Sequence, residues 1–568
     1  MEAFFQQGPV LGNPFAADPL LQAFLRWRLP ADLQETLAPG LLAFGRRIVD
    51  EVQELGPQAE SHPPRLIPYS PWGERIDQIE VSGAWQRLQD IAAREGLVAI
   101  GYERAEGAFS RLHQFSRLYM FHPDAAWFTC PLAMTDGAAR ALELHGDDAL
   151  KDRALAHLLS RDPAEFWTAG QWMTERGGGS DVGHGTETTA KKHGGEYLLH
   201  GDKWFTSATT SPVALTLARI EGAPAGGSGL SLFFVELFDE TGRLRNIRIN
   251  RLKDKLGTHA LPTAELSLQG TPARLVGDKA HGIRKMSSLF NLTRIHNSVY
   301  AVSYMRRALA LAKDYASKRK AFGKPLAELP AHAETLSEMQ VEWEGCFHLT
   351  FHLTLLLGRE ETGESAEGEA ALLRLLTPVA KLFTAKRAVS GVAEAMECFG
   401  GAGYVEDTGL PALMRDTLVL PIWEGTTNVL AMDVLRAMEK EGAFEPFADD
   451  VAARLRKVKG DALSESVRRV RKALETLQEG RRRMDGFESE FAEAIARPFA
   501  YGLARTYIGS LLLEFASWMA NEGGPAPDPN QLRSAAVAVR WCREPLVSLP
   551  DADSVHRRVS SDILKEKP

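Results

Sequence analysis

The chain has 568 residues, of which 44% are hydrophobic and 25% are charged, and its formal net charge is −8. At roughly 100–200 residues per domain, this length predicts three to five domains whose cores need no disulfide or metal support. The composition excludes a disordered chain, a collagen and a coiled-coil rod, and the negative net charge argues against a generic polyanion binder.

The cysteines and the N-terminal residues indicate the cellular compartment. Its four cysteines lie far apart without a C-x-x-C pair, so we expect reduced thiols and no cysteine-rich zinc site. The first seven residues contain one acid and no base, which predicts neither a secretory signal nor an Arg-rich transit peptide. No apolar run approaches 18 residues, and the histidines lack metal-ligand spacing. We therefore expect a cytoplasmic protein with no membrane span and no bound metal.

The N-terminal part reads as two segments. Short helices punctuated by prolines are predicted up to residue 65, followed by an extended connector around Tyr69, because prolines gather at positions 63, 64, 68 and 71. Residues 75–160 read as helices, since apolar side chains recur there at helical spacing. We predict an N-terminal extension over 1–70 and an α-helical domain over 71–165.

Residues 166–276 change from helical to strand-like spacing, which predicts a β-domain. A hairpin is expected where residues 196–201 follow a Gly-Gly turn at 194–195. The apolar run 230–235 and the alternating run 264–268 predict two more strands. The apolar period therefore switches from 3.6 to 2.0 and back again along the chain.

The rest of the chain is predicted to be helical. Long periodic segments at 297–320, 331–358 and 370–399 define a helical domain over 277–440, and residues 441–568 form a further one. The predicted fold class is therefore mainly α with a central β-domain.

Two short pieces of the β-domain carry candidate chemistry. A predicted strand runs into three consecutive glycines at 177–179, flanked by Thr174 and Ser180. Glycines let backbone amides approach an anion, and the hydroxyls add donors. Thirty residues later, Phe205 and Ser207 end a strand where an aromatic ring could cover a flat cofactor. A plain glycine turn and a buried aromatic strand remain the alternatives for each piece taken alone.

Three further pieces lie in the helical domain. Arg319–Leu326 follows a long helix, so its cations either complement the helix dipole or bind a pyrophosphate, with Phe322 against an adenine. Gly400 and Gly401 follow Glu397 and end a helix. Glu424 stands between an aromatic residue and a glycine just before a helix, where N-terminal capping is the simpler alternative.

Together and in this order, the five pieces resemble the flavin-dependent acyl-CoA dehydrogenase family over residues 80–435. The extra terminal segments, the triplet Trp423-Glu424-Gly425 and the run 251–257 are similar to the AidB branch, the alkylation-response subgroup. The resemblance implies an α-helical domain, a β-domain and a four-helix bundle, assembled as a homotetramer, with an extra helical domain at the C-terminus.

The resemblance also implies roles for single residues. Glu424 would be the general base that removes the α-proton of an acyl-CoA, while a hydride passes from Cβ to flavin N5, and Arg294 would be the substrate-site arginine. FAD would be held by Met173, Thr174, Gly179, Ser180, Phe205, Ser207, Thr426 and Asn428. The FAD of a neighbouring subunit would be reached by Arg319, Phe322, Glu397, Gly400 and Gly401.

The C-terminal domain supports a competing function. Residues 454–483 carry 11 Lys/Arg and four Asp/Glu. An apolar stripe is formed by Val467, Val470, Leu474 and Leu477, so the cations are expected to face outward. The alternative function is an AidB-like flavoprotein that binds double-stranded DNA without sequence preference, with only residual dehydrogenase activity. The candidate DNA-binding residues are Arg468, Arg469, Arg471, Lys472, Arg481, Arg482 and Arg483. A solvated helix face is the simpler interpretation.

Overall fold

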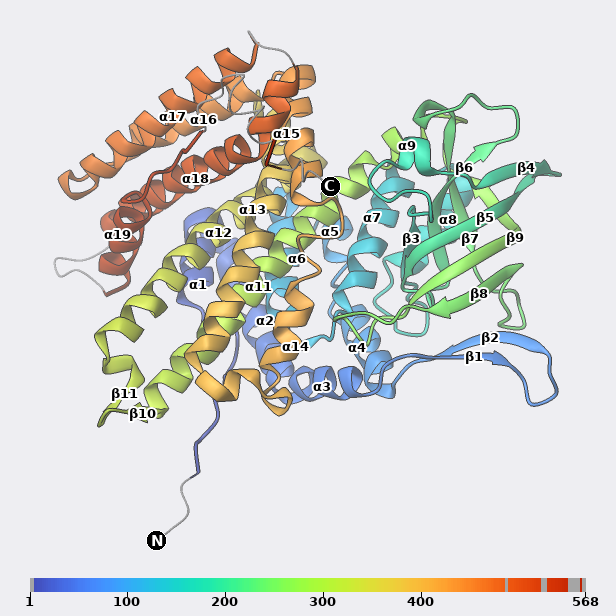
Figure 1. Cartoon of the computed structure of the whole chain (residues 1–568), viewed down its shortest axis with the longest axis horizontal. Helices are drawn as coiled ribbons and strands as arrows, with labels where there is room; N and C mark the ends of the chain where they lie inside the picture. The colour runs from blue at the N-terminus through green and yellow to red at the C-terminus, as the bar shows by residue number, and fades with distance from the viewer. Residues whose placement is uncertain (1–4, 486–488, 523–528, 550–561, 564–568) are drawn as a thin grey trace. The chain divides into compact units, whose positions relative to one another are not determined.

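The structure is a computed structural model that describes residues 5–485, 489–522, 529–549 and 562–563 (Figure 1). It is mainly helical with a central sheet domain, which confirms the predicted fold class. The chain forms two compact units. The sheet unit comprises residues 12–17 and 35–296, and the helical unit comprises residues 5–11, 18–34 and the described residues from 297 onwards. The prediction about the N-terminal leader rests partly on residues 1–4, which lie outside this description.

Most of the predicted helices at the start of the chain are present. Ser82 and Asp147 begin two of them by accepting backbone hydrogen bonds from Trp85 and Leu150, at 3.2 and 2.7 Å. The helices are α2 (Ala31–Arg47), α3 (Gln53–Ser61), α4 (Gly83–Arg94), α5 (Ile100–Glu103), α6 (Ser110–Phe121), α7 (Thr129–His145) and α8 (Asp148–Leu158).

The region around Tyr69 differs from the prediction. It is extended as expected, but β1 (Arg65–Tyr69) pairs with β2 (Arg75–Glu80) in an antiparallel hairpin instead of forming a plain connector. The β2 segment was predicted to be helical, and that prediction is wrong. Its sequence RIDQIE lacks clear apolar alternation, and the hairpin is held by neighbours such as the Ile249 carbonyl, which accepts a 2.8 Å hydrogen bond from Arg75.

A seven-stranded sheet forms the centre of the sheet unit. Its strands run in the order β3-β6-β4-β5-β9-β7, with β8 on β9, and β6 also pairs with β7, so the sheet closes on itself. The predicted strands and the hairpin after residues 194–195 are confirmed. The strands are β3 (Ala169–Trp172), β4 (Thr189–His193), β5 (Glu196–Ser207), β6 (Val213–Ile220), β7 (Leu230–Glu236), β8 (Ile247–Leu252) and β9 (Thr263–Leu275).

The two faces of the sheet bury different apolar clusters. On β6, Leu215 and Leu217 join a cluster with α7 and α8, whereas Ala214 and Ala218 join a cluster with Trp172 and other sheet residues. This alternation follows from the strand period of two. The end of β3 is thereby fixed by packing on both faces, directly before the glycine-rich turn.

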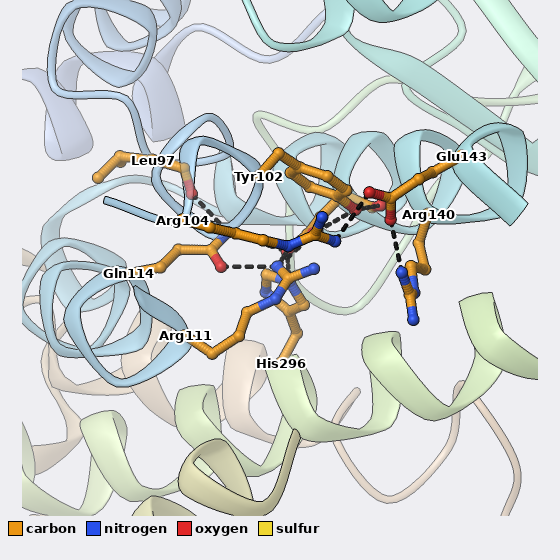
Figure 2. A network of polar contacts seen from close by, with 9 residues as sticks. Leu97, Tyr102, Arg104, Arg111, Gln114, Arg140, Glu143 and His296 are labelled. Atoms are coloured by element: carbon orange, nitrogen blue, oxygen red, sulfur yellow. Dashed lines mark hydrogen bonds and ion pairs between the residues drawn. The ribbon is translucent and has the colours of Figure 1, made fainter. Parts of the chain in front are cut away.

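A polar network around Asp136, buried except at half-buried Tyr102, ties α5, α6, α7 and the start of α11 (Ser287–Lys318) together (Figure 2). Asp136 accepts hydrogen bonds from Arg111, Gln114 and Tyr102 at 2.8–3.0 Å, and His296 Nε2 lies 2.8 Å away. Burial opposes ionisation of Asp136, but the Arg111 charge and the His296 contact outweigh it and hold the pKa of this carboxyl below its usual range. The network thus keeps a compensated charge inside the α-helical part.

The helical unit is built from long helices. α12 (Pro330–Thr362) packs against α13 (Glu369–Cys398), which packs against α15 (Thr427–Glu441). The long helix α18 (Ser489–Asn521) contacts all three of them. The predicted long helices are confirmed, although α11 (Ser287–Lys318) begins ten residues early. The other helices are α1 (Pro19–Arg28), α14 (Leu410–Thr417), α16 (Phe444–Lys457), α17 (Ser464–Asp485), α18 (Ser489–Asn521) and α19 (Pro529–Trp541). Among the described helices, none is long and apolar enough to cross a bilayer.

His348 of α12 lies buried among aromatic rings. Its ring centroid is 4.5 Å from that of Phe515 and 5.7 Å from that of Phe24, and neither ring nitrogen has a hydrogen-bond partner in the described structure. Burial, aided by the charge of Arg28, lowers the pKa of His348 to about 3. The folded chain therefore holds this histidine neutral over the physiological range.

We expect His348→Leu to reduce the acid sensitivity of the protein. Below about pH 6.5 the unfolded chain protonates His348 and the folded chain does not, so the stability contributed by neutral His348 is lost as pH falls towards 3, by about 1.4 kcal/mol per pH unit. Chemical denaturation at pH 7.5, 5.5 and 4.5 measures this slope. A His348→Leu slope equal to that of the parent and of a His193→Gln control would contradict the expectation.

Candidate active site

The glycine-rich turn of the sheet unit follows β3 directly. Glu175 and Gly178 exchange backbone hydrogen bonds of 3.1 and 3.2 Å, which closes a tight turn. The backbone N–H groups of Gly177, Gly179 and Ser180 have no partner within the described chain, and all three residues are exposed. Adjacent unpaired N–H groups of this kind form an anion-binding site.

A buried ion pair fixes this turn to the neighbouring strand. Lys203 Nζ lies 2.6 Å from Glu175 Oε1 and also donates to the Leu217 carbonyl at 3.0 Å. The same carboxylate accepts hydrogen bonds from the Glu187 N–H and the Thr188 hydroxyl, at 2.7 and 2.5 Å. Burial lowers the pKa of Lys203, and Glu175 opposes that shift. Sequence reasoning missed this role, although both residues belong to the motifs it singled out.

Three predicted cofactor residues come together through these contacts. The Trp204 N–H donates to the Thr174 carbonyl at 2.9 Å, which joins the turn to the end of β5. Phe205 is 51% exposed there, and the Ser207 hydroxyl lies 3.1 Å from that of Thr263. The side chain of Met173 is buried in the core, so a ligand contact from this residue would come from its main chain.

The donor set of the sheet unit fits a flavin dinucleotide. An exposed aromatic face at Phe205, the hydroxyls of Thr174 and Ser207, and the unpartnered N–H groups of the turn offer an apolar surface, polar-edge donors and phosphate donors respectively. Gly179 lies beside Thr174, because a Cβ at Gly179 would meet its methyl group at 3.5 Å. The predicted substrate residue Arg294 is half-buried on α11, with Asn291 Oδ1 3.5 Å from its Nη1.

The predicted base lies in a separate turn of the helical unit. Glu424 has a φ of +53°, in the left-handed region that a residue with a side chain rarely adopts, and Gly425 follows with a φ of +100°. Thr426 is the N-cap residue of α15, and Asn428 is exposed in its first turn. Glu424 therefore precedes the cap position by two residues. Thr426 occupies that position, and its side chain makes no capping hydrogen bond in the described structure.

A lysine that sequence reasoning missed holds this turn. Lys381 of α13 is fully buried, and its Nζ donates to the carbonyls of Trp423 and Gly425 at 2.6 and 2.7 Å. The Trp423 indole donates to Asn297 Oδ1 at 2.5 Å. The signal in the sequence was a single cation within the apolar run 375–383, but nothing in the sequence showed which carbonyls it would meet.

The remaining predicted cofactor residues form a second group at one end of the helical unit. Phe322 is 95% exposed in the turn after α11. Glu397 is exposed in the last turn of α13, and Gly400 and Gly401 are exposed just after it. Tyr315, one turn before Arg319, stacks on Phe399 with ring centroids 4.4 Å apart, so the two pieces lie together. This group is about 27 Å from Lys381 along α13, at 1.5 Å per residue. Within one chain the structure therefore separates it from the Glu424 turn.

The basic segment of the C-terminal domain is only partly as predicted. Val470, Leu474 and Leu477 are buried and Val467 is half-buried, while the cations of α17 are exposed apart from half-buried Arg481. The expectation that Arg454 faces outward is wrong. Arg454 is buried in ion pairs with Asp450 and Glu514, because α16 turns this position towards α18.

Family models match the chain in four consecutive stretches. Residues 8–163 match the Adaptive response protein AidB N-terminal domain, and residues 170–271 and 280–439 match the acyl-CoA dehydrogenase middle and C-terminal domains. Residues 442–566 match a domain described as Acyl-CoA dehydrogenase 11 C-terminal domain-like.

Whole-length relatives agree with these matches. Acyl-CoA dehydrogenase family member 11 of Caenorhabditis elegans is 44% identical over 585 residues, which covers 98% of this chain and 92% of the relative. This chain belongs to the acyl-CoA dehydrogenase family. The putative acyl-CoA dehydrogenase AidB of Escherichia coli is 32% identical and covers 84% of this chain and 85% of its own, which confirms the predicted AidB-like resemblance.

Solved structures of the family show the same architecture. The C. elegans ACDH-11 complex with C11-CoA superposes with a TM-score of 0.95 at 43% identity, covering 99% of this chain and 97% of that chain. A Bacillus anthracis acyl-CoA dehydrogenase complexed with FAD shares the fold, with a TM-score of 0.73 at 19% identity over 98% and 92% of the two chains. Members of the family are FAD-dependent, which confirms the predicted cofactor.

Proposed function

We propose that this chain oxidises an acyl-CoA thioester to the 2-enoyl-CoA, with Glu424 as the general base. The observation that carries the proposal is the Glu424 turn, where an acidic residue is held in left-handed backbone directly before α15. A left-handed glutamate costs folding free energy, so a requirement for its carboxylate at this place accounts for it. The full-length likeness to a relative solved with C11-CoA supports an acyl-CoA as the substrate.

The reaction requires the protein to stabilise the enolate and to remove the α-proton. A thioester α-proton is a weak acid, so hydrogen bonds to the thioester oxygen, including one from the Glu424 backbone amide, would stabilise the developing enolate. The Glu424 carboxylate would take the α-proton, an effect typically worth about 10²–10⁴-fold. When bound, FAD supplies the acceptor for the hydride that leaves Cβ. Thr174, Ser180, Phe205 and Ser207 would hold it, and Arg294 would stand near the substrate.

Anaerobic mixing of the FAD-loaded protein with saturated acyl-CoAs tests this function. We expect the visible flavin absorbance to fall with undecanoyl-CoA or a chain of similar length, and one 2-enoyl-CoA to appear per flavin reduced. Butanoyl-CoA and free undecanoic acid serve as comparison ligands. Unchanged absorbance with every thioester from 4 to 16 carbons would overturn the proposal.

The assembly and location belong to the same proposal. Exposed Phe322 and the loop from Glu397 to Gly401 lie far along α13 from the Glu424 turn, which supports their contact with the FAD of a neighbouring subunit in a homotetramer. We assign the protein to the cytoplasm. We also propose five domains: an N-terminal extension (1–70), an α-helical domain (71–165), a β-domain (166–276), a four-helix bundle (277–440) and a C-terminal helical domain (441–568).

A second candidate function rests on α17 (Figure 1). Arg471, Arg482 and Arg483 are exposed on this helix without an ion-pair partner in the described structure. Arg468 and Arg469 instead pair with Glu465, and Lys472 lies 3.7 Å from Glu475, which reduces the net charge of the face. The three unpaired arginines support weak contact with duplex DNA phosphates.

Reversing these charges tests the DNA-binding candidate. We expect the combined Arg471→Glu, Arg482→Glu and Arg483→Glu variant to retain FAD and to bind a labelled 30-bp duplex at least tenfold more weakly at low salt, with a flatter salt dependence. A plot of log affinity against log salt concentration has a slope of about −0.9 per phosphate contact, so each lost contact makes the slope shallower by about 0.9. Lys191→Glu, Lys192→Glu and Arg248→Glu form the charge-matched control. Equal binding by both variants, or no binding by the parent at 25 mM salt, would leave α17 as a solvated face.

A further inference from the structure

We propose that Lys381 is a positioning residue that fixes the backbone of Glu424 in its reactive conformation. The inference rests on the proposed role of Glu424 as the base. Lys381 acts through the main chain on either side of that residue rather than on a substrate.

The geometry around the ammonium is specific. Nζ of Lys381 donates to the Trp423 carbonyl at 2.6 Å and to the Gly425 carbonyl at 2.7 Å. These two carbonyls belong to the residues on either side of Glu424. One side chain on a long helix therefore contacts two peptide groups of a single turn, 423–424 before the predicted base and 425–426 after it.

These hydrogen bonds oppose the intrinsic preference of the turn. Left-handed backbone is unfavourable for a residue with a side chain, and Glu424 has a φ of +53°. Hydrogen bonds to a charged group are stronger than those between neutral groups, and the two bonds from Lys381 favour this conformation. The adjacent indole of Trp423 is fixed independently by Asn297, at 2.5 Å.

The position of the lysine suits a role in holding the Glu424 turn. Lys381 is fully buried in α13, between Ala380 and Leu382, which are also buried. Burying an ammonium carries a large desolvation cost, and an apolar residue of similar length would avoid it. A buried cation that donates to the carbonyls of the residues on either side of Glu424 is therefore placed to impose the conformation of this turn.

Loss of the ammonium should harm the chemical step more than binding. Without these bonds the turn relaxes towards common backbone angles and the carboxylate moves away from the α-carbon. A misplacement of about 1 Å can cost 10²-fold in rate. The acyl-CoA and FAD contacts of other residues remain, so KM and flavin content should change little.

The test uses the FAD holoenzyme and three variants at this position. Lys381→Met removes the donors at similar length, Lys381→Gln keeps a neutral donor, and Lys381→Arg keeps the charge. Lys440→Met, an exposed lysine on α15, is the matched control. Two rates are measured per bound flavin: turnover of undecanoyl-CoA, and solvent deuterium exchange at the α-carbon of 3-thiaundecanoyl-CoA. Sulfur replaces Cβ in that probe, so no hydride can leave and only proton removal is observed.

We expect Lys381→Met to lower kcat and α-proton exchange at least tenfold with KM within threefold of the parent, and Lys381→Gln or Lys381→Arg to restore part of both rates. A purely structural role would lower the melting temperature and flavin content but leave the rates per bound flavin unchanged, which would overturn the inference. If Lys381→Met does not fold, parental exchange in Lys381→Gln would overturn it. Glu424→Gln separates the two proposals. If this variant exchanges the α-proton at the parental rate, Glu424 is not the base. If it loses exchange while the Lys381 variants keep the parental rate, only the positioning role of Lys381 is refuted.

Discussion

Glu424→Gln is expected to lower acyl-CoA turnover per bound flavin by at least 10²-fold and to leave FAD binding intact. Glutamine has nearly the same shape but cannot accept the α-proton, so the general-base contribution of about 10²–10⁴-fold is lost. The backbone conformation stays equally unfavourable for glutamine, so the melting temperature should stay within a few degrees of the parent. Stopped-flow flavin reduction by undecanoyl-CoA measures the effect directly.

The control for this variant is an exposed acid on the adjoining helix. Glu439 lies on the solvent side of α15, so Glu439→Gln removes one negative charge without touching the turn. We expect its reduction rate to equal that of the parent. Equal rates for Glu424→Gln and the parent would show that another group removes the proton.

Lys203→Met is expected to destabilise the sheet unit by about 3–5 kcal/mol and to release FAD. Removing one partner of a buried ion pair leaves the other charge without compensation. Here the remaining charge is the Glu175 carboxylate, which also organises the backbone of Glu187 and Thr188 around the glycine-rich turn. Chemical denaturation and flavin content after gel filtration measure the two consequences.

The double variant Glu175→Gln with Lys203→Met separates charge from packing. A neutral amide needs no counter-charge, so the double variant should be more stable than Lys203→Met alone. The coupling free energy between the two substitutions should be about 0.5–3 kcal/mol, as for other contacting pairs. Additive losses would show that the pair does not interact as the 2.6 Å contact implies.

The sequence was sufficient to predict those helices and strands that a local residue pattern determines. The alternation in β9, the Gly-Gly hairpin before β5 and the apolar period of α12 and α13 all predicted the elements that the structure contains. The Glu424 motif was likewise found correctly at the entrance to a helix, because glycine and a cap residue follow it within the same few positions.

The sequence was insufficient to predict side-chain contacts whose two partners lie far apart in the chain. Arg454 was predicted to be exposed because its neighbours are basic, yet Glu514, 60 residues away, pairs with it in the interior. Lys381 and its carbonyl partners at 423 and 425 are separated by about 40 positions, and no periodicity links them. Contacts of this kind depend on how helices pack, which a single sequence does not encode locally.

The left-handed backbone at Glu424 also has an evolutionary consequence. Glycine and asparagine adopt a φ near +53° more easily than glutamate does. A duplicated copy of this gene that no longer needed the reaction would gain by replacing Glu424 with one of them, since folding would no longer be opposed at that position. The residue found at this place in a paralogue therefore indicates whether that paralogue still depends on proton abstraction, independently of how well the rest of its sequence is preserved.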